Sequence, residues 1–194
     1  MFDFIVALVG ILILLPLLPA IALLIVADTP GGVFFKQNRV GRNRRIFPLY
    51  KFRTMYSNAE RSGQLTVGHH DNRITRTGYW LRKYKLDELP QLFNILMGNM
   101  SFVGPRPEVE KYVNNYSAEQ LRVLNVKPGL TDYSSLDFFN ESSLLATATQ
   151  PEKYYIDKIL PMKISRSLNY IDQRSFTKDL RVIFITIKRC LLNR

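Results

Sequence analysis

The stretch FIVALVGILILLPLLPAIALLIVA, residues 4–27, decides the fold, because it contains no charged residue. As one straight helix it would reach about 36 Å, enough for the roughly 30 Å hydrocarbon core of a bilayer. A cleaved signal peptide is the poorer interpretation, since no Lys or Arg precedes the apolar run and the run is longer than the apolar core of such peptides. The stretch is therefore predicted to be a membrane segment.

Two prolines, Pro16 and Pro19, lie near the middle of this segment. Each lacks a backbone N–H and clashes with the preceding turn, so the helix is expected to kink sharply near its middle. Each half would then reach only about 17 Å, which makes a re-entrant hairpin compete with a tilted span. We predict a re-entrant membrane helix over residues 1–28, whose exposed backbone at the break needs polar partners.

The part of the chain after this segment is strongly basic. The 194 residues carry a formal net charge of +11, and no acidic residue lies between positions 36 and 53. Basic clusters beside a membrane segment mark its cytoplasmic side. The hydrophobic content of 46% excludes disorder, and a single cysteine excludes a disulfide framework. Residues 29–194 are therefore predicted to form one cytoplasmic domain.

The apolar pattern of this domain predicts an α+β fold that is mainly helical. Short strands or loops are expected around residues 33–35 and 47–52, and helices over residues 77–84 and 87–98. Residues 175–192 place apolar side chains on one face and basic side chains on the rest. That pattern is typical of an interfacial amphipathic helix and equally of a core helix with a basic outer face.

Asp87 and Glu88 stand in LDELPQ, residues 86–91, at the expected first turn of a helix. Unpaired backbone N–H groups favour negative charge there, so we expect both carboxylates to be ionised at neutral pH. A helix cap would account for the pair structurally. A functional interpretation needs phosphate nearby, because carboxylates attack phosphoryl groups to form acyl phosphates and Mg²⁺ shields the approach of like charges.

Candidate phosphate ligands are cations held in constrained segments. Pro105 and Pro107 restrict Arg106 to an extended backbone, so its guanidinium is presented from a stiff loop. Further candidates are Arg73, Arg76, Arg82 and Lys127. His69 and His70 lack a third donor at metal-ligand spacing, so we predict no metal role for them.

Five blocks carry a resemblance: YKFRTM at 50–55, DNRITRTG at 71–78, LDELPQL at 86–92, MSFVGPRP at 100–107 and KPGLT at 127–131. In this order they resemble the bacterial sugar transferases, and more narrowly the small monotopic, PglC-like phosphoglycosyl transferases. The resemblance implies an enzyme of the bacterial inner membrane with its catalytic domain on the cytoplasmic face. Such an enzyme moves a phosphosugar from a UDP-sugar to undecaprenyl phosphate, releases UMP, requires Mg²⁺ and initiates glycan assembly.

The resemblance also implies residue roles. Asp87 would be the nucleophile that forms a covalent aspartyl phosphosugar intermediate, and Glu88 would help to place the metal and Asp87. Arg106 would bind phosphate, and Arg82 would be a phosphate-binding or structural partner. Membrane lipids are expected partners, and a homodimer stays open.

Two departures from the family pattern limit what is carried over. Leu15-Pro16 stands where relatives have Ser-Pro, and residues 131–141, TDYSSLDFFNE, differ from the usual Thr-Gly-x-x-Gln-Val-Asn-Gly-Arg, so the donor sugar is not predicted. A membrane-anchored phosphohydrolase using Asp87 stays an alternative, as does a membrane-tethered basic protein that binds nucleic acid. The latter gives no reason for a carboxylate pair beside a proline-braced arginine, so we expect no nucleic-acid partner.

Overall fold

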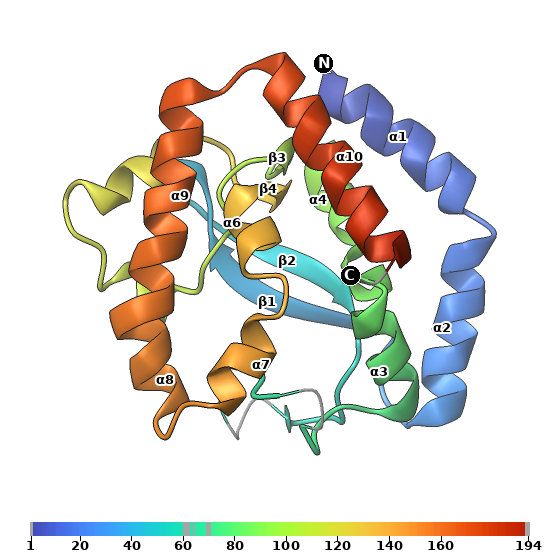
Figure 1. Cartoon of the computed structure of the whole chain (residues 1–194). Helices are drawn as coiled ribbons and strands as arrows, with labels where there is room; N and C mark the ends of the chain where they lie inside the picture. The colour runs from blue at the N-terminus through green and yellow to red at the C-terminus, as the bar shows by residue number, and fades with distance from the viewer. Residues whose placement is uncertain (1, 60–62, 64, 69–70, 193–194) are drawn as a thin grey trace.

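The computed structural model describes residues 2–59, 63, 65–68 and 71–192. Helices dominate, and two small sheets lie among them (Figure 1), in agreement with the predicted α+β, mainly helical class. The α-helices are α1 (Phe2–Leu14), α2 (Leu17–Asp28), α3 (Arg76–Lys83), α4 (Gln91–Leu96), α5 (Glu110–Val113), α6 (Tyr133–Asp137), α7 (Glu141–Ala146), α8 (Pro151–Tyr154), α9 (Leu160–Gln173) and α10 (Phe176–Leu192). Short 3₁₀ and π segments are η1 (Arg42–Arg44), η3 (Leu86–Glu88), η4 (Gln120–Asn125) and the π-helix η5 (Tyr155–Ile159).

The two sheets are a hairpin and a short parallel pair. β1 (Phe34–Val40) and β2 (Ile46–Phe52) run antiparallel, close to the two strand positions that the sequence predicts. β3 (Ser101–Val103) and β4 (Gly129–Thr131) pair in parallel and were not predicted. Only glycine fits where they meet, because a Cβ on Gly129 would lie 2.1 Å from the nitrogen of Gly104. This close approach fixes the start of the loop that carries Arg106.

The N-terminal helices are broken at Pro16. α1 and α2 are bent by 62° relative to each other at this point. α2 runs through Pro19, which lies in its first turn, where a missing N–H breaks no helical bond. The predicted kink near the middle of the segment is thus found at Pro16, and the helix continues through Pro19. Among the described residues no single helix is long and apolar enough to cross a bilayer, although this bent pair is when both helices are taken together.

One face of the bent pair packs on the rest of the chain, with α1 against α4 and α2 against α3 (Figure 1). Ala7 and Ile11 are buried in a cluster with Leu92, and Ile21 and Ile25 in a second cluster. The opposite face exposes large apolar side chains, among them Ile5, Leu8, Leu12, Ile13, Leu23 and Leu24. Such a surface is much larger than the scattered apolar residues of ordinary protein surfaces.

Both ends of the bent pair are hydrogen-bonded to the same body. The Ser101 hydroxyl donates to the carboxylate of Asp3 at 2.7 Å, and the backbone N–H of Thr77 donates to Asp28 at 2.8 Å. The guanidinium of Arg53 also donates to the backbone oxygen of Thr29 at 2.8 Å. Asp3 and Asp28, which lie at the two ends of the bent pair, are therefore both held by the rest of the chain. The division into a membrane segment 1–28 and a domain 29–194 stays a prediction.

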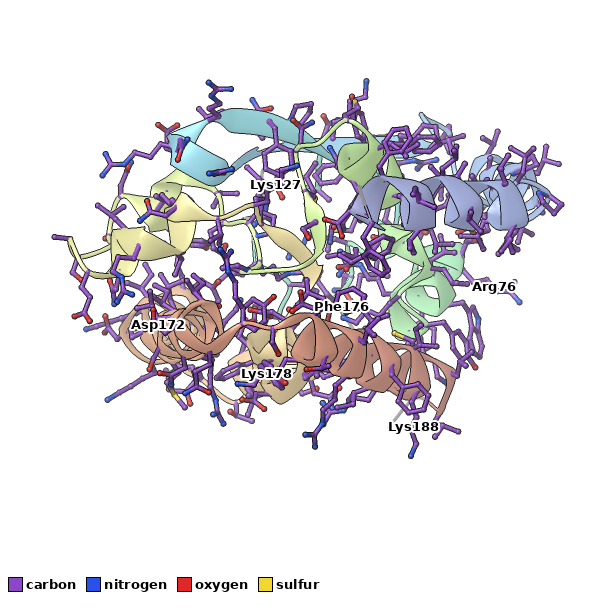
Figure 2. All side chains as sticks on the ribbon, turned by 90° about the horizontal axis from the view of Figure 1, so that it is seen from above. Arg76, Lys127, Asp172, Phe176, Lys178 and Lys188 are labelled. Carbon is purple, nitrogen blue, oxygen red and sulfur yellow. The ribbon has the colours of Figure 1, made fainter. Side chains whose placement is uncertain are left out.

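α10 confirms the helix predicted over residues 175–192 and leaves its apolar face uncovered. Val182 is fully buried, whereas the side chains of its apolar stripe are 43–76% exposed: Phe176, Leu180, Phe184, Ile187 and Leu191. A core helix would bury this stripe, so the exposure favours the interfacial interpretation. Figure 2 shows Phe176 at the start of α10, where its ring lies 5.1 Å from that of Phe2 in α1. The two exposed apolar surfaces therefore meet.

Candidate active site around Asp87 and Glu88

The helix expected from Asp87 to Gly98 is divided into a 3₁₀ turn, η3, and α4. Lys85 enters η3 with a left-handed backbone (φ 56°), and Pro90 separates η3 from α4. This break turns Asp87 inward, so that it is only 6% exposed. Within the described chain neither η3 nor α4 has a side-chain cap, and Oδ1 of Asp87 is buried without a hydrogen-bond partner. Helix capping therefore does not explain Asp87.

Glu88 is held by two cations from distant parts of the chain. Nζ of Lys51 lies 3.0 Å from Oε1 of Glu88. The two terminal nitrogens of Arg106 lie 2.5 Å from Oε1 and 3.4 Å from Oε2. Lys51 comes from β2 and Arg106 from the loop after β3, so folding brings three sequence blocks together.

Lys51 was not predicted as a site residue. A signal for it was present, because Lys51 follows Phe47 and Leu49 at two-residue spacing and so shares their inward face of β2. A lysine at an inward position of a strand needs a carboxylate partner. In the sequence, however, nothing indicated which carboxylate that would be.

Burial and neighbouring charges shift the pKa values of Asp87 and Glu88 in opposite directions. Burial raises the pKa of Asp87 above its ordinary value, although Lys51 opposes this shift. Burial alone would also raise the pKa of Glu88, but Arg106 and Lys51 outweigh it and hold that pKa well below the ordinary value of a glutamate. Both carboxylates were expected to be ionised at neutral pH; the structure adds that Glu88 is the stable anion and that Asp87 is the carboxylate that is harder to ionise.

Of the remaining predicted cations, Arg82 acts on Asp87, whereas Arg73 makes its contacts within its own loop. The charge of Arg82 lowers the pKa of Asp87, and its guanidinium donates to the hydroxyls of Thr54 and Thr66 at 2.8 and 2.9 Å. Arg73 instead pairs with Asp71 at 2.6 Å and donates to backbone oxygens of its own loop.

Two other candidates give no support to the site. Lys127 is exposed, and its Nζ lies 3.7 Å from where a Cβ of Gly98 would stand, at the opposite end of α4 from Asp87. It therefore does not join the carboxylate pair. His69 and His70 lie outside the described residues.

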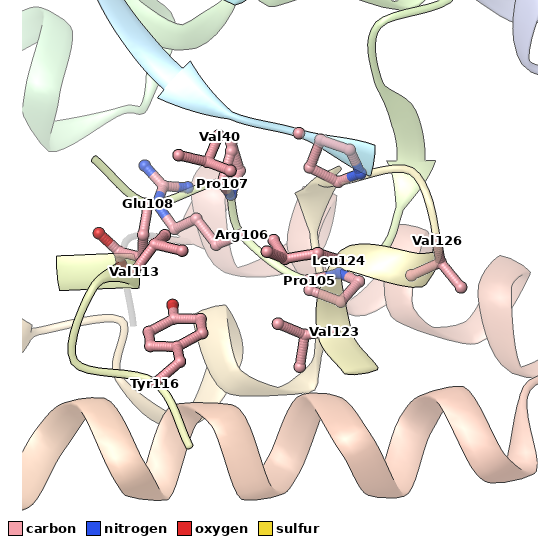
Figure 3. Close-up of a pocket in the computed structure, with 12 residues that line it drawn as sticks. Val40, Pro105, Arg106, Pro107, Glu108, Val113, Tyr116, Val123, Leu124 and Val126 are labelled. Carbon is pink, nitrogen blue, oxygen red and sulfur yellow. The ribbon is translucent and has the colours of Figure 1, made fainter. Parts of the chain in front are cut away.

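A small pocket adjoins the arginine loop (Figure 3). Apolar side chains such as Val40, Val113 and Val123 line much of it, together with Arg106 and Glu108. Neither carboxylate of the pair lines this space, so it lies behind the arginine rather than at Asp87. The site is instead a buried carboxylate pair under a rim of cations.

Asp87 and Glu88 are the carboxylates of this site that would hold a divalent cation such as Mg²⁺ if one binds. Among the described residues no group of three or more His, Cys, Asp or Glu could hold a metal. Mg²⁺ commonly keeps several waters and takes one or two carboxylates plus substrate phosphates. The unpartnered Oδ1 of Asp87 suits such a role better than Glu88, whose oxygens already face Lys51 and Arg106.

Comparison with known proteins identifies the family. A family profile described as bacterial sugar transferase matches residues 1–193. The chain belongs to the bacterial sugar transferase family. The predicted resemblance to the bacterial sugar transferases is thereby confirmed.

Two of the three curated relatives described here are named as sugar phosphotransferases. The UDP-N-acetylgalactosamine-undecaprenyl-phosphate N-acetylgalactosaminephosphotransferase of Aeromonas hydrophila is 36% identical over 193 residues, which is 97% of this chain and 42% of that protein. The undecaprenyl-phosphate glucose phosphotransferase of Komagataeibacter xylinus is 34% identical over 200 residues, 100% of this chain and 36% of that protein. The exopolysaccharide production protein PSS of Rhizobium leguminosarum bv. phaseoli is 35% identical over 197 residues, 96% of this chain and 91% of that protein. The chain thus spans about two-fifths of the first two relatives and most of the third.

Proposed function

We propose that this member of the bacterial sugar transferase family transfers a phosphosugar from a UDP-sugar to undecaprenyl phosphate and releases UMP. The observation that carries the proposal is the buried, unpartnered Oδ1 of Asp87 beside Glu88, which Arg106 and Lys51 hold as an anion. Two relatives are named for undecaprenyl phosphate but for different sugars, N-acetylgalactosamine and glucose, so the donor sugar stays open.

The proposed reaction has two displacements at one phosphorus atom. An oxygen of Asp87 attacks the phosphate that bears the sugar, and the bond to the bridging oxygen breaks, so that UMP leaves with the electron pair. An oxygen of undecaprenyl phosphate then attacks the same phosphorus, and the bond to Asp87 breaks. The products are an undecaprenyl diphosphate sugar and a regenerated carboxylate.

Burial suits Asp87 to this role. A carboxylate with few hydrogen bonds is a poorly solvated and therefore better nucleophile, while nearby positive charge keeps part of it ionised. Arg106 and Lys51 place positive charge where phosphate oxygens must approach the carboxylate pair. Bound Mg²⁺ would supply further neutralisation of phosphate charge, with Asp87 and Glu88 as its nearest carboxylates.

The test is incubation of the full chain in lipid with undecaprenyl phosphate, Mg²⁺ and a panel of UDP-sugars. We expect UMP release with at least one donor, and labelled sugar phosphate in the lipid fraction. Labelled sugar phosphate in water, independent of undecaprenyl phosphate, would instead establish the phosphohydrolase. Absence of UMP release with every donor would overturn the proposal.

We further propose that the bent α1–α2 pair enters and leaves the inner membrane on its cytoplasmic face. The bonds of Asp3 and Asp28 to the same body support this topology. So does the exposed stripe of α10, which meets α1 at Phe2 and Phe176. Undecaprenyl phosphate keeps its phosphate at the interface, so this arrangement would hold Asp87 where the acceptor arrives.

Cysteine labelling tests the topology. Cys190 is replaced by serine, and single cysteines are placed at Phe2 and Arg42, both exposed positions. A membrane-impermeant thiol reagent should label neither in intact cells and both in opened cells. Labelling at Phe2 from outside, with Arg42 protected, would establish a spanning helix.

A further inference from the structure

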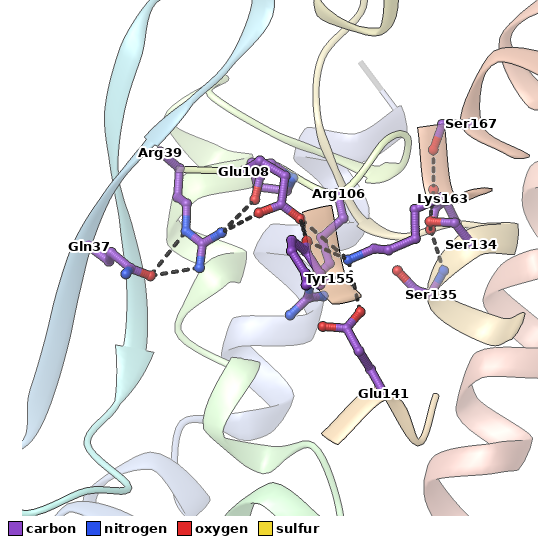
Figure 4. A network of polar contacts seen from close by, with 12 residues as sticks. Gln37, Arg39, Arg106, Glu108, Ser134, Ser135, Glu141, Tyr155, Lys163 and Ser167 are labelled. Atoms are coloured by element: carbon purple, nitrogen blue, oxygen red, sulfur yellow. Dashed lines mark hydrogen bonds and ion pairs between the residues drawn. The ribbon is translucent and has the colours of Figure 1, made fainter. Parts of the chain in front are cut away.

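A buried lysine lies behind the arginine loop and is not part of the proposed reaction. Lys163, on α9, is only 7% exposed. Its ammonium lies 3.3 Å from Oε1 of Glu108 and 3.0 Å from Oε2 of Glu141 (Figure 4), and it donates to the Tyr155 hydroxyl at 3.2 Å. Glu108 follows Arg106 by two residues, and Glu141 opens α7. Lys163 thus joins α9 to two segments that border the site.

The charged groups around Lys163 and Arg106 form connected ion pairs. Lys163 and Arg39 pair with Glu108, Lys163 also pairs with Glu141, and Arg106 and Lys51 pair with Glu88. Glu108 also receives Arg39 at 3.3 Å and the Tyr155 hydroxyl at 2.6 Å. Arg106 pairs with Glu88, yet both Glu108 and Glu141 also act on its charge. Three carboxylates therefore attract one guanidinium.

The charge of Lys163 determines how strongly Glu108 and Glu141 attract Arg106. Burial disfavours its charged form, but Glu108 and Glu141 outweigh burial and raise the pKa of the ammonium. Lys163 is therefore protonated and positively charged, and it lies between Glu108 and Glu141. Figure 4 shows Arg106, Lys163 and Glu141 directed into the same region. In such a poorly solvated place, a carboxylate that loses its cation strongly attracts the next one.

We propose that Lys163 is a positioning residue for Arg106. By neutralising Glu108 and Glu141 it leaves the guanidinium on Glu88, at the place where phosphate would bind. The inference rests on the proposed function, and it adds a residue that neither contacts the carboxylate pair nor belongs to its sequence blocks. The ion pair between Lys163 on α9 and Glu141 on α7 would then affect catalysis.

The decisive experiment compares K163M with the double variant K163M/E141Q in the UMP-release assay and in binding of UDP. K163M releases Glu141 to compete for Arg106, so kcat/KM should fall by at least about tenfold and UDP should bind more weakly. The double variant removes the competing carboxylate together with the lysine and keeps the net charge. Its kcat/KM should return to within about threefold of the wild type.

Two controls separate charge balance from packing. Y155F removes the 2.6 Å hydrogen bond to Glu108 without changing any charge, and we expect less than about a threefold loss of kcat/KM. K111M breaks the exposed pair of Lys111 with Glu152 and should leave the kinetics unchanged. A lysine that only stabilised the fold would give the opposite order, because the double variant loses more buried polar contacts than K163M.

Folding of each variant is checked by circular dichroism and thermal melting. An unchanged K163M, or a folded double variant that is no more active than a folded K163M, overturns the role of Lys163. If K163M does not fold, the double variant decides: activity near the wild type supports the role, and a folded, inactive double variant overturns it. A wild type that neither releases UMP nor binds UDP overturns the proposed function itself, and with it the phosphate role of Arg106.

Discussion

Replacement of Arg106 by lysine tests whether the shape of the guanidinium matters beyond its charge. Two nitrogens of Arg106 reach the two oxygens of Glu88, at 2.5 and 3.4 Å. A lysine ammonium carries the same charge but cannot present two donors in one plane to a carboxylate or phosphate. R106K therefore keeps the net charge of the site and removes one directed contact.

The size of the loss follows from one missing hydrogen bond between the guanidinium and a phosphate oxygen of the substrate. A hydrogen bond to a charged group contributes about 1.5–3 kcal/mol. At about 1.36 kcal/mol for each tenfold change in rate, this corresponds to a loss of about 10-fold to about 150-fold in kcat/KM. Because the side chain of Arg106 is 30% exposed, solvent screens part of the interaction, and we take about tenfold as the minimum.

The assay is UMP release over a range of UDP-sugar concentrations at fixed Mg²⁺. R166K is the matched control, since Arg166 pairs with Asp137 at 2.7 Å on the surface, with 59% of the arginine side chain exposed. We expect R166K to behave as wild type, as exposed ion pairs contribute little. Wild-type kinetics for R106K would refute a phosphate grip by Arg106 and leave it a structural partner of Glu88.

Three other substitutions probe the nucleophile, its ionisation and the membrane pair. D87N should abolish turnover and any covalent intermediate detected by mass spectrometry while remaining folded, since Oδ1 has no partner to lose among the described residues; a folded, active D87N would disprove the nucleophile. K51M should move the acid limb of the kcat–pH profile to higher pH. Asp87 must be ionised to attack, and burial already raises its pKa above the ordinary value of about 3.9. Because Lys51 opposes that rise, its removal should raise the pKa of Asp87 further. An acid limb that stays in place would contradict this assignment. D3A removes the 2.7 Å bond from Ser101 and should cost about 1 kcal/mol, or roughly 2–4 °C in melting temperature, and S101A should add no further loss in the double variant.

Local sequence patterns predicted the elements whose causes are local. The break at Pro16 follows from the missing N–H of proline, and α10 follows from helical periodicity. Two short strands or loops were expected near β1 and β2, but not their pairing as a hairpin. β3 and β4 are three residues each and pair across a long sequence separation, so no periodic signal announces them. Their pairing depends instead on tertiary contact and on the absence of side chains at Gly104 and Gly129.

The candidate site was predicted by residue type but not by environment. Asp87, Glu88 and Arg106 were named from the sequence, and folding brings Arg106 onto Glu88. The difference in ionisation between Asp87 and Glu88 could not be predicted, because burial and the arrival of Lys51 are tertiary properties. Conversely, Arg73 was predicted to bind phosphate, although Asp71, two residues before it, already offers it a local partner.

The two tethers of the bent pair connect its position to both halves of the candidate site. Ser101, which bonds to Asp3, starts β3 and precedes Arg106 by five residues along a short strand and a proline-braced loop. Thr77, which bonds to Asp28, lies in the first turn of α3, and α3 packs on η3, which carries Asp87. α1 also packs on α4, which continues from the Asp87 turn. The two helices of the bent pair therefore contact the segment that leads to Arg106 and the elements that flank Asp87, which places the pair directly against the candidate site.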